Sequence, residues 1–409
     1  MDDRSFKPTH SDLITAIEPL IQKHLNTKED FFSETLPEFG IGERQAIETL
    51  APIVFNGAAK LDAAHAFAHM DPPTPWITWI TTLWNASLNQ NLLHPDVAPK
   101  ATTFETQVIK WLAPFFGMSG GHMTPGSTIS NLTALWVARD NNNTSIKKVL
   151  ASEDAHLSIQ KAASILGLKL IKLKTNSKGE MRSDEIPSDL SKTALVLTAG
   201  TTTAGSIDNL QIKQKAAWIH VDAAWAGPLR LSNNFSNILN GIDRADSVSI
   251  SGHKWFFQPK ESGLIFFKDV LTANKTISTS SGYLTSDNIG ILGSHGAVAL
   301  PLLSTLMAWG KTGLIERLER SMNLSVQLWG KLQEHPNIIV FNKPTTGVIL
   351  WRLHSNNQTK ELFSLLPDGS ASFIDYKDHF WIRNVAANPL ADVEVLWENI
   401  ERALKTFKP

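Results

Sequence analysis

Six short apolar runs follow one another between residues 148 and 267, and helical or loop segments separate most of them. The runs do not alternate with polar residues, which is typical of strands that are covered on both faces. Alternation of such strands with helices predicts an α/β sandwich with a largely parallel sheet. The six runs are 148–151, 168–173, 194–198, 218–221, 247–250 and 264–267.

Helical patterns flank this region on both sides. Apolar residues recur at helical spacing over 11–25 and 104–116, a further helix is predicted over 129–139, and residues 56–100 read as irregular structure with short helices. Gly120, Gly121 and Gly126 flank a predicted loop.

The pattern changes after Gly310, where a small α+β domain is predicted. A long amphipathic helix is expected over 314–332, strands over 338–341 and 348–353, and a last helix over 392–404. We therefore predict three parts: an N-terminal helical segment at 1–60, a large domain at 61–310 and a small C-terminal domain at 311–409.

Composition excludes several functions. Lys and Arg total 38 against 39 Asp and Glu, so the formal net charge of -1 offers no basic excess to attract nucleic acid or an anionic membrane. Cysteine is absent, which excludes disulfides, thiolate metal ligands and a cysteine nucleophile, and we expect no metal. The first residues lack the apolar segment of a secretory signal, and the run 76–84 is too short to span a bilayer, so a cytoplasmic location is expected.

Two charged residues follow the ends of predicted strands, which is where parallel α/β sheets bind their ligands. Lys254 lies in SGHKW, directly after the run 247–250; apolar surroundings lower the pKa of a lysine and make its amine the nucleophile that Schiff-base chemistry needs. Asp222 lies in WIHVDAAW, where a buried carboxylate needs a cationic partner such as a protonated pyridine nitrogen. Taken singly, a surface lysine and a helix-capping aspartate explain these residues equally well.

Three further segments supply other polar groups. The Gly/Ser/Thr-rich stretch GHMTPGSTISN at 121–131 opens a helix, whose backbone N–H groups form an anion site. His156 follows the first run, and hydroxyls at 201–203 follow the third. Each alone fits a turn or a structural histidine. Together with Asp222 and Lys254 they match the needs of pyridoxal phosphate: a phosphate cup, a ring stacker, a partner for the ring nitrogen and a lysine.

Five motifs resemble the group II pyridoxal-phosphate-dependent decarboxylases, which include glutamate, aromatic-L-amino-acid, cysteine sulfinate and diaminobutyrate decarboxylases. The resemblance covers roughly residues 50 to 405. It implies fold type I, with a mostly parallel seven-stranded sheet between helices and a small C-terminal α+β domain. The motifs are TPGSTISNLTAL (124–135), AHLSIQKAASILG (155–167), TAGTTTAGSIDNL (198–210), HVDAAWAG (220–227) and SGHKW (251–255).

The resemblance also implies roles for individual residues. Lys254 would form the internal aldimine, Asp222 would pair with the ring nitrogen, and His156 would stack on the ring. The expected activity is decarboxylation of an L-amino acid to the amine and carbon dioxide, through an external aldimine and a quinonoid. Members of the family are typically homodimers with active sites at the subunit interface. The remaining assignments are Gly126, Ser127 and His253 at the phosphate, Thr202 and Ala224 beside the cofactor, and Arg383 at the substrate α-carboxylate.

Two positions depart from the family pattern. Tyr283, one of only two tyrosines, lies 29 residues after Lys254 and suits the proton donor of aromatic amino acid decarboxylases, but pocket wall or interface packing explains it as well. His295 stands where relatives usually carry an arginine that reaches the neighbouring subunit's cofactor phosphate. A histidine is shorter and is often neutral near pH 7, which puts that contact in doubt.

Alternative activities share the same residues. A carbon–carbon lyase like sphingosine-phosphate lyase uses the same Asp, His and Lys set, and a decarboxylating aldehyde synthase diverts the same intermediate to oxygen. An inactive paralogue that serves as a binding partner is the non-enzymatic alternative, although Lys254, Asp222 and His156 are intact. The identity of the amino acid stays open; Trp225 and the TPGSTISN wording favour the acidic-substrate branch.

Overall fold

The computed structural model describes residues 9–20, 35–141, 146–282, 284 and 287–406. The chain divides into two compact units, residues 1–60 and 61–409. The first unit contains α1 (His10–Ile17), a 3₁₀ turn at Glu18–Leu20 and α2 (Glu43–Asn56). The predicted helix over 11–25 therefore matches α1 over 11–17, and its last residues, 21–25, lie outside the described residues.

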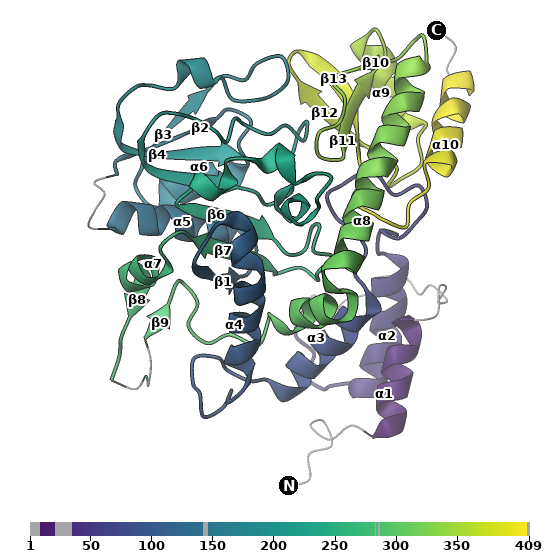
Figure 1. Ribbon diagram of the computed structural model, residues 1–409. Coiled ribbons are helices and arrows are strands. Elements are labelled where there is room, and N and C mark those ends of the chain that lie inside the picture. The colour runs from purple at the N-terminus through teal and green to yellow at the C-terminus, as the bar shows by residue number, and fades with distance from the viewer. Residues whose placement is uncertain (1–8, 21–34, 142–145, 283, 285–286, 407–409) are drawn as a thin grey trace. The chain divides into compact units, whose positions relative to one another are not determined.

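A seven-stranded sheet forms the centre of the second unit (Figure 1). Its strand order is β1-β7-β6-β5-β4-β2-β3, and β2 to β6 are parallel, whereas β7 is antiparallel to both of its neighbours. This confirms the predicted α/β fold with a mostly parallel sheet. The strands are β1 (Gly120–Thr124), β2 (Lys148–Ser152), β3 (Lys169–Leu173), β4 (Leu190–Thr198), β5 (Ala216–Asp222), β6 (Ser247–Ser251) and β7 (Gly263–Phe267).

The edge strand β1 corrects one prediction, because the glycine-rich stretch before Gly126 is a strand and not a loop. Gly121 faces β7 so closely that an added Cβ would lie 1.9 Å from the carbonyl oxygen of Ile265. Glycine is poor in isolated strands but permits such a close approach of two backbones. The pairing with β7, which no local pattern reveals, makes this segment a strand.

Helices cover the sheet and enclose two apolar cores. Side chains of α5, α6 and α7 pack in one core with residues of β2 and β7, and a larger core joins α4 and α8 to the strands. Near-complete burial of both strand faces explains why the runs are apolar throughout. The helices are α3 (Trp76–Leu88), α4 (Ala101–Leu112), α5 (Ser127–Asp140), α6 (Leu157–Ile165), α7 (Val270–Ile277) and α8 (Leu300–Glu334), and β8 (Ser278–Thr279) pairs with β9 (Asn288–Ile289).

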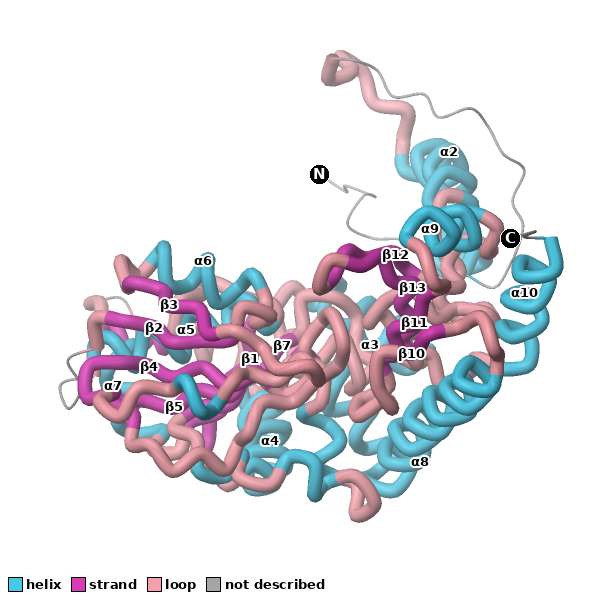
Figure 2. Tube along the Cα trace, turned by 90° about the horizontal axis from the view of Figure 1, so that it is seen from above, coloured by secondary structure: helices cyan, strands magenta, loops and turns pink. Residues whose placement is uncertain are grey.

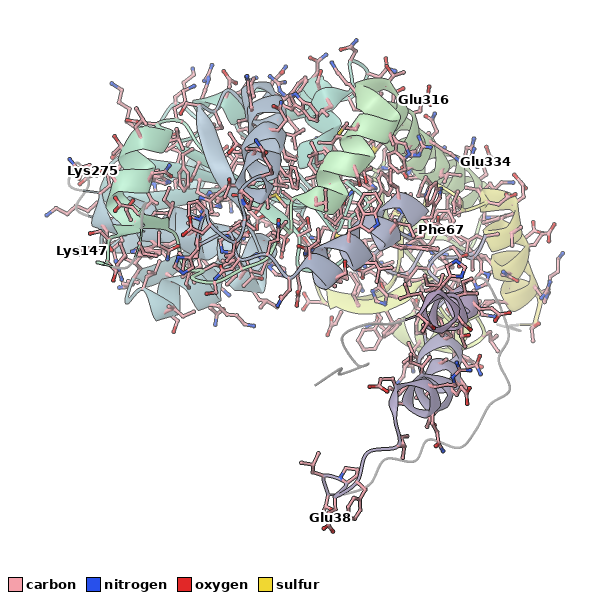
Figure 3. All side chains as sticks on the ribbon, turned by 90° about the horizontal axis from the view of Figure 1, so that it is seen from below. Glu38, Phe67, Lys147, Lys275, Glu316 and Glu334 are labelled. Carbon is pink, nitrogen blue, oxygen red and sulfur yellow. The ribbon has the colours of Figure 1, made fainter. Side chains whose placement is uncertain are left out.

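A four-stranded antiparallel sheet forms the C-terminal part, in the order β10-β11-β13-β12. In Figure 2 its strands form a group separate from those of the large sheet. Its core also takes in Phe67, which is fully buried and is labelled in Figure 3. The elements are β10 (Ile339–Val340), β11 (Val348–Arg352), α9 (Asn356–Ser364), β12 (Ser372–Tyr376), β13 (His379–Val385) and α10 (Val393–Thr406).

The long helix α8 connects the large domain to the C-terminal part. It packs on α3 and α4, and it also contacts β10, β11 and α10. It bends at Gly310, whose φ of 61° lies in the left-handed region. This is the residue at which the pattern of the sequence changes, and the division at 310 and 311 stays a prediction. Among the described residues, no helix combines the length and the apolar character that a membrane crossing requires.

Candidate active site

The predicted site residues gather at one edge of the large sheet. The carboxyl ends of parallel strands meet at the same edge. Asp222 ends β5, Lys254 follows β6 by three residues, and His156 follows β2 by four. The segment after β4 carries Thr202, and the turn after β1 carries Gly126. The structure therefore brings together segments that lie more than 100 residues apart in the chain.

Asp222 is almost completely buried and is held by neutral donors. Its Oδ2 accepts a hydrogen bond from Nδ2 of Asn131 at 2.9 Å, and its Oδ1 accepts one from the backbone N–H of Ala224 at 3.1 Å. The Ser249 hydroxyl lies 3.5 Å from Oδ1. No lysine or arginine forms an ion pair with Asp222 among the described residues. A buried carboxylate in this state favours a cationic ligand.

Lys254 enters the site from the turn after β6 and has no hydrogen-bond or ion-pair partner within the described parts of the chain. Burial lowers the pKa of its amine, and Asp222 and Asp71 act in the opposite direction. Arg383 and Lys260 lower the pKa further. A lowered pKa raises the fraction of uncharged amine, which is the nucleophilic form.

His156 is the N-cap residue of α6. Its Nδ1 accepts a hydrogen bond from the backbone N–H of Ser158 at 3.3 Å, and the Ser158 hydroxyl lies 2.8 Å from the same atom. Burial lowers the pKa of His156, the charge of Asp222 raises it, and the charge of Lys254 lowers it. The imidazole is therefore oriented by the start of α6 and lies within electrostatic reach of both other candidates.

A helix N-terminus and a histidine form the predicted phosphate site. Gly126 is the N-cap of α5 with a φ of 126°, and Ser127 begins the helix. An added Cβ at Gly126 would lie 3.7 Å from Cε1 of His253, so these two residues are neighbours. The Ser127 hydroxyl accepts a hydrogen bond from Ser251 at 2.9 Å. Free N–H groups at the start of a 14-residue helix suit an anion.

Arg383 lies on β13 of the small sheet but reaches the segment that follows β4. It is 5 % exposed, and its Nε donates to the carbonyl of Thr202 at 2.8 Å. Its Nη1 donates to the carbonyl of Ala68 and to the Ser372 hydroxyl. The two Nη2 donors have no acceptor among the described residues, and burial lowers the pKa of Arg383 to about 10. The charge of Asp71 acts on Arg383 from a distance, but no carboxylate of a described residue forms an ion pair with it, so an anionic ligand suits it.

The other candidates lie elsewhere or cannot be placed. Tyr283 lies outside the described residues. His295 donates from Nδ1 to the carbonyl of Gly293 at 2.7 Å and lines a cavity of about 670 Å³ with Glu105 and His122. Neither Lys254 nor Asp222 lines that cavity. Trp225 is buried and stacks on Trp255, with ring centroids 3.9 Å apart.

Sequence reasoning missed two residues at the centre of the site. Asn131 and His220 are both fully buried and hydrogen-bonded to each other at 2.9 Å. Both lie inside motifs that the sequence analysis quotes, TPGSTISN and HVDAAWAG. A polar residue on the buried side of α5 is the signal that points to Asn131, because a buried amide needs partners.

The charges fit pyridoxal phosphate. Asp222 supplies an unpaired buried carboxylate for the ring nitrogen, Lys254 an unpaired amine, and the start of α5 an anion site. The cofactor offers a cationic ring nitrogen, an aldehyde and a phosphate. Each of these three groups thus has a counterpart of matching chemistry on the cofactor.

Comparisons with known proteins show which family and which fold the chain shares. The family model described as "Pyridoxal-dependent decarboxylase conserved domain" matches residues 29–354. The chain is 30% identical over 385 residues to L-2,4-diaminobutyrate decarboxylase of Acinetobacter baumannii, covering 82% of this chain and 74% of that protein. It is 26% identical over 389 residues to aspartate 1-decarboxylase of Aliivibrio fischeri, covering 81% and 71%. Rhodiola rosea 4-hydroxyphenylacetaldehyde synthase has a similar structure, with a TM-score of 0.84, 19% identity and 99% of both chains covered.

Proposed function

The chain belongs to the pyridoxal-dependent decarboxylase family and is a pyridoxal-phosphate enzyme, and on that premise we propose that it releases carbon dioxide from an L-amino acid with Lys254, Asp222 and His156 as catalytic residues. The observation that carries the proposal is the meeting of an unpaired lysine, an unpaired buried carboxylate and an N-cap histidine at one sheet edge. Where buried charged residues serve only the stability of the fold, they are normally paired or hydrogen-bonded within the protein.

The bound cofactor supplies an electron sink for the pair of electrons that the departing carboxyl group leaves behind. Lys254 would be the residue that holds the cofactor covalently, and its lowered pKa suits an amine that must act in its uncharged form. Asp222 would keep the ring nitrogen protonated, because the attraction between its negative charge and a cationic nitrogen is stronger at a buried site than in water. His156, held at the start of α6, would cover one face of the ring and keep water from it.

We assign the substrate α-carboxylate to Arg383. Its guanidinium is fixed by three hydrogen bonds to the chain, and its Nη2 side remains for a carboxylate. The bond from Nε to the Thr202 carbonyl joins this residue to the cofactor side of the site. A guanidinium that is held in place before substrate binds loses little entropy when it orients a carboxylate.

The phosphate group is assigned to Gly126, Ser127 and His253, and the cofactor's surroundings to Thr202 and Ala224. The proton that returns to the substrate is assigned on the sequence alone to Tyr283. A homodimer with active sites at its interface and a cytoplasmic location likewise rest on the sequence alone.

The direct test is the cofactor bond. Purified protein incubated with pyridoxal phosphate is expected to show an aldimine absorbance band that sodium borohydride fixes covalently to Lys254. Lys254→Ala is expected to lose the band and the activity. An unchanged band in Lys254→Ala would refute the assignment of the lysine.

The reaction is tested with a panel of L-amino acids that includes 2,4-diaminobutyrate, aspartate, glutamate and an aromatic amino acid. We expect one of them to yield equimolar amine and carbon dioxide without consuming oxygen. An aldehyde formed with oxygen uptake would identify an aldehyde synthase instead. Cofactor binding without carbon dioxide from any amino acid would favour the lyase or the inactive paralogue.

A further inference from the structure

Asn131 on α5 makes four hydrogen bonds within the fully buried space behind the site. Its Nδ2 donates to Oδ2 of Asp222 and to the hydroxyl of Ser158, both at 2.9 Å. Its Oδ1 accepts from Nε2 of His220 at 2.9 Å and from the hydroxyl of Ser249 at 2.5 Å. One amide thus bonds four neighbours on three different elements, α6, β5 and β6, and all of its own bonding capacity is used.

The chemistry of these partners fixes the direction of every bond. An ionised carboxylate only accepts, so the NH₂ group of Asn131 must face Asp222. The amide oxygen then faces Nε2 of His220, which must carry a proton. Burial lowers the pKa of His220 to about 4, so the ring is neutral at pH 7 and its Nδ1 is a bare acceptor.

The far end of His220 closes this chain of bonds. Its Nδ1 lies 2.9 Å from the hydroxyl of Ser247, which donates to it. The same hydroxyl accepts from the indole N–H of Trp218 at 2.9 Å. Every donor from Trp218 to Asp222 therefore has an acceptor. A bare Nε2 on His220 would face the amide oxygen of Asn131, and a flipped amide would face Asp222 with its oxygen, so either change would set two acceptors against each other.

The same logic extends from Asn131 to His156. The Ser158 hydroxyl accepts from Asn131 with its oxygen, which leaves its own proton for Nδ1 of His156 at 2.8 Å. The Ser158 backbone N–H, which cannot accept, points at the same nitrogen. Nδ1 of His156 is therefore unprotonated, and the neutral ring carries its proton on Nε2.

We propose that Asn131 is a positioning residue that joins Asp222 and His156 into one hydrogen-bonded unit and sets both His156 and His220 as neutral Nε2–H tautomers. If His156 is neutral, the Asp222 carboxylate can pair with the cofactor's ring nitrogen alone. A cationic imidazolium near Asp222 would compete with the ring nitrogen for the carboxylate. The Nε2–H of His156 makes no hydrogen bond to another described residue, so it is available to a ligand.

The first test reads the tautomers in the full-length chain freed of cofactor. Long-range ¹H–¹⁵N NMR on histidine-labelled protein separates bare from protonated ring nitrogens. We expect wild-type protein to show both rings with bare Nδ1 and protonated Nε2 at pH 7. Asn131→Leu removes the acceptor of His220 and is expected to shift its ring to a mixture of tautomers. A His220 or His156 ring with protonated Nδ1 in the wild type would overturn the proposal.

The second test measures the dissociation constant of pyridoxal phosphate. Loss of a hydrogen bond to a charged group predicts a dissociation constant about 10- to 100-fold higher in Asn131→Leu. Asn131→Asp, which keeps the shape but sets a second carboxylate against Asp222, covers the case of a misfolded Leu variant and is expected to weaken binding similarly. Wild-type affinity in either folded variant would overturn the proposal. Neither readout uses an amino acid, so failure here is separate from failure of the proposed reaction.

A matched control is Asn388→Leu. Asn388 is equally buried and is bonded at both ends of its amide, to the carbonyl of Ala63 and to the N–H of Leu390. It belongs to neither the cofactor nor the substrate assignment. We expect it to lose stability while both histidine tautomers and the cofactor affinity remain as in the wild type. If Asn388→Leu changes the histidine tautomers and the cofactor affinity as much as Asn131→Leu does, the effect of Asn131 is general destabilisation, and the proposal is overturned.

Discussion

Replacing Tyr376 by phenylalanine is expected to loosen the attachment of the small sheet to the segment that carries His156. Tyr376 ends β12, and its hydroxyl donates to Oδ2 of Asp154 at 2.6 Å. Asp154 lies in the turn between β2 and α6, two residues before His156. Phenylalanine keeps the ring against Phe341, whose centroid is 5.6 Å away, so the substitution removes little besides the hydroxyl.

The magnitude follows from the burial and charge of the pair. Burial raises the pKa of Asp154, and the Tyr376 hydroxyl opposes this rise by stabilising the ionised form. Hydrogen bonds to charged groups contribute about 1.5–3 kcal/mol, so we expect Tyr376→Phe to lower the free energy of unfolding by about 2 kcal/mol at pH 7. The hydroxyl favours the ionised carboxyl, so the loss is full above the raised pKa of Asp154. It shrinks as the pH falls and the carboxyl becomes protonated.

The assay is a double-mutant cycle by urea unfolding of cofactor-free protein. Tyr376→Phe, Asp154→Asn and the double variant give the coupling free energy between the two side chains. We expect a coupling of at least about 1 kcal/mol at pH 7 and a smaller one at pH 4. A coupling within about 0.3 kcal/mol of zero, which is the scatter of additive sites, would refute the reasoning.

Three further predictions concern ligands. Arg383→Gln is expected to raise KM about 10- to 100-fold through loss of a charge-assisted bond to the substrate carboxylate, with the cofactor absorbance unchanged, and an unaltered KM would contradict the assignment. Gly126→Ala forces a side chain onto a φ of 126° and is expected to weaken cofactor binding about tenfold or more in a titration, whereas wild-type affinity would show that this backbone can relax. Burial lowers the pKa of His253 to about 4, and its Nδ1–H donates to the Ser262 carbonyl, so its Nε2 is bare before phosphate binds. The phosphate charge raises that pKa, so binding takes up a proton and weakens as the pH rises above 4; His253→Gln is expected to flatten this part of the profile, and an identical profile would exclude His253 from the phosphate site.

Most of the large sheet was predictable because a strand that is buried on both faces is apolar throughout, and this pattern is visible in the sequence of each strand by itself. The six apolar runs coincide with β2 to β7 within a few residues. The strand β1 was not predictable, because Gly120 and Gly121 carry no strand preference of their own. These glycines form a strand because they pair with β7, and that pairing is visible only in the structure. The small sheet was predicted in part, through β10 and β11, while β12 and β13 gave no continuous apolar run.

The sequence predicted those site residues that directly follow an apolar strand. It did not predict contacts between residues that lie far apart in the chain. Asp222 and Lys254 each stand directly after an apolar run, so their position is visible in the local sequence. The bond from Asn131 to Asp222 joins residues 91 positions apart, and the bond from Arg383 to Thr202 joins residues 181 apart. No local pattern shows which buried donor faces which buried acceptor.

The way in which the site's charges are held indicates why a ligand binds there. Asp222 is positioned by an amide and a backbone N–H, and Arg383 by two carbonyls and a hydroxyl, so each is fixed by neutral groups. Had the two charges been paired with each other, or with Lys254, the pair would be stable and no charge would remain for a ligand. Neutral partners supply orientation without supplying the opposite charge. Under the proposed function, a cationic ring nitrogen at Asp222 and a carboxylate at Arg383 would supply the two missing opposite charges, and their binding would offset the cost of burying each charge.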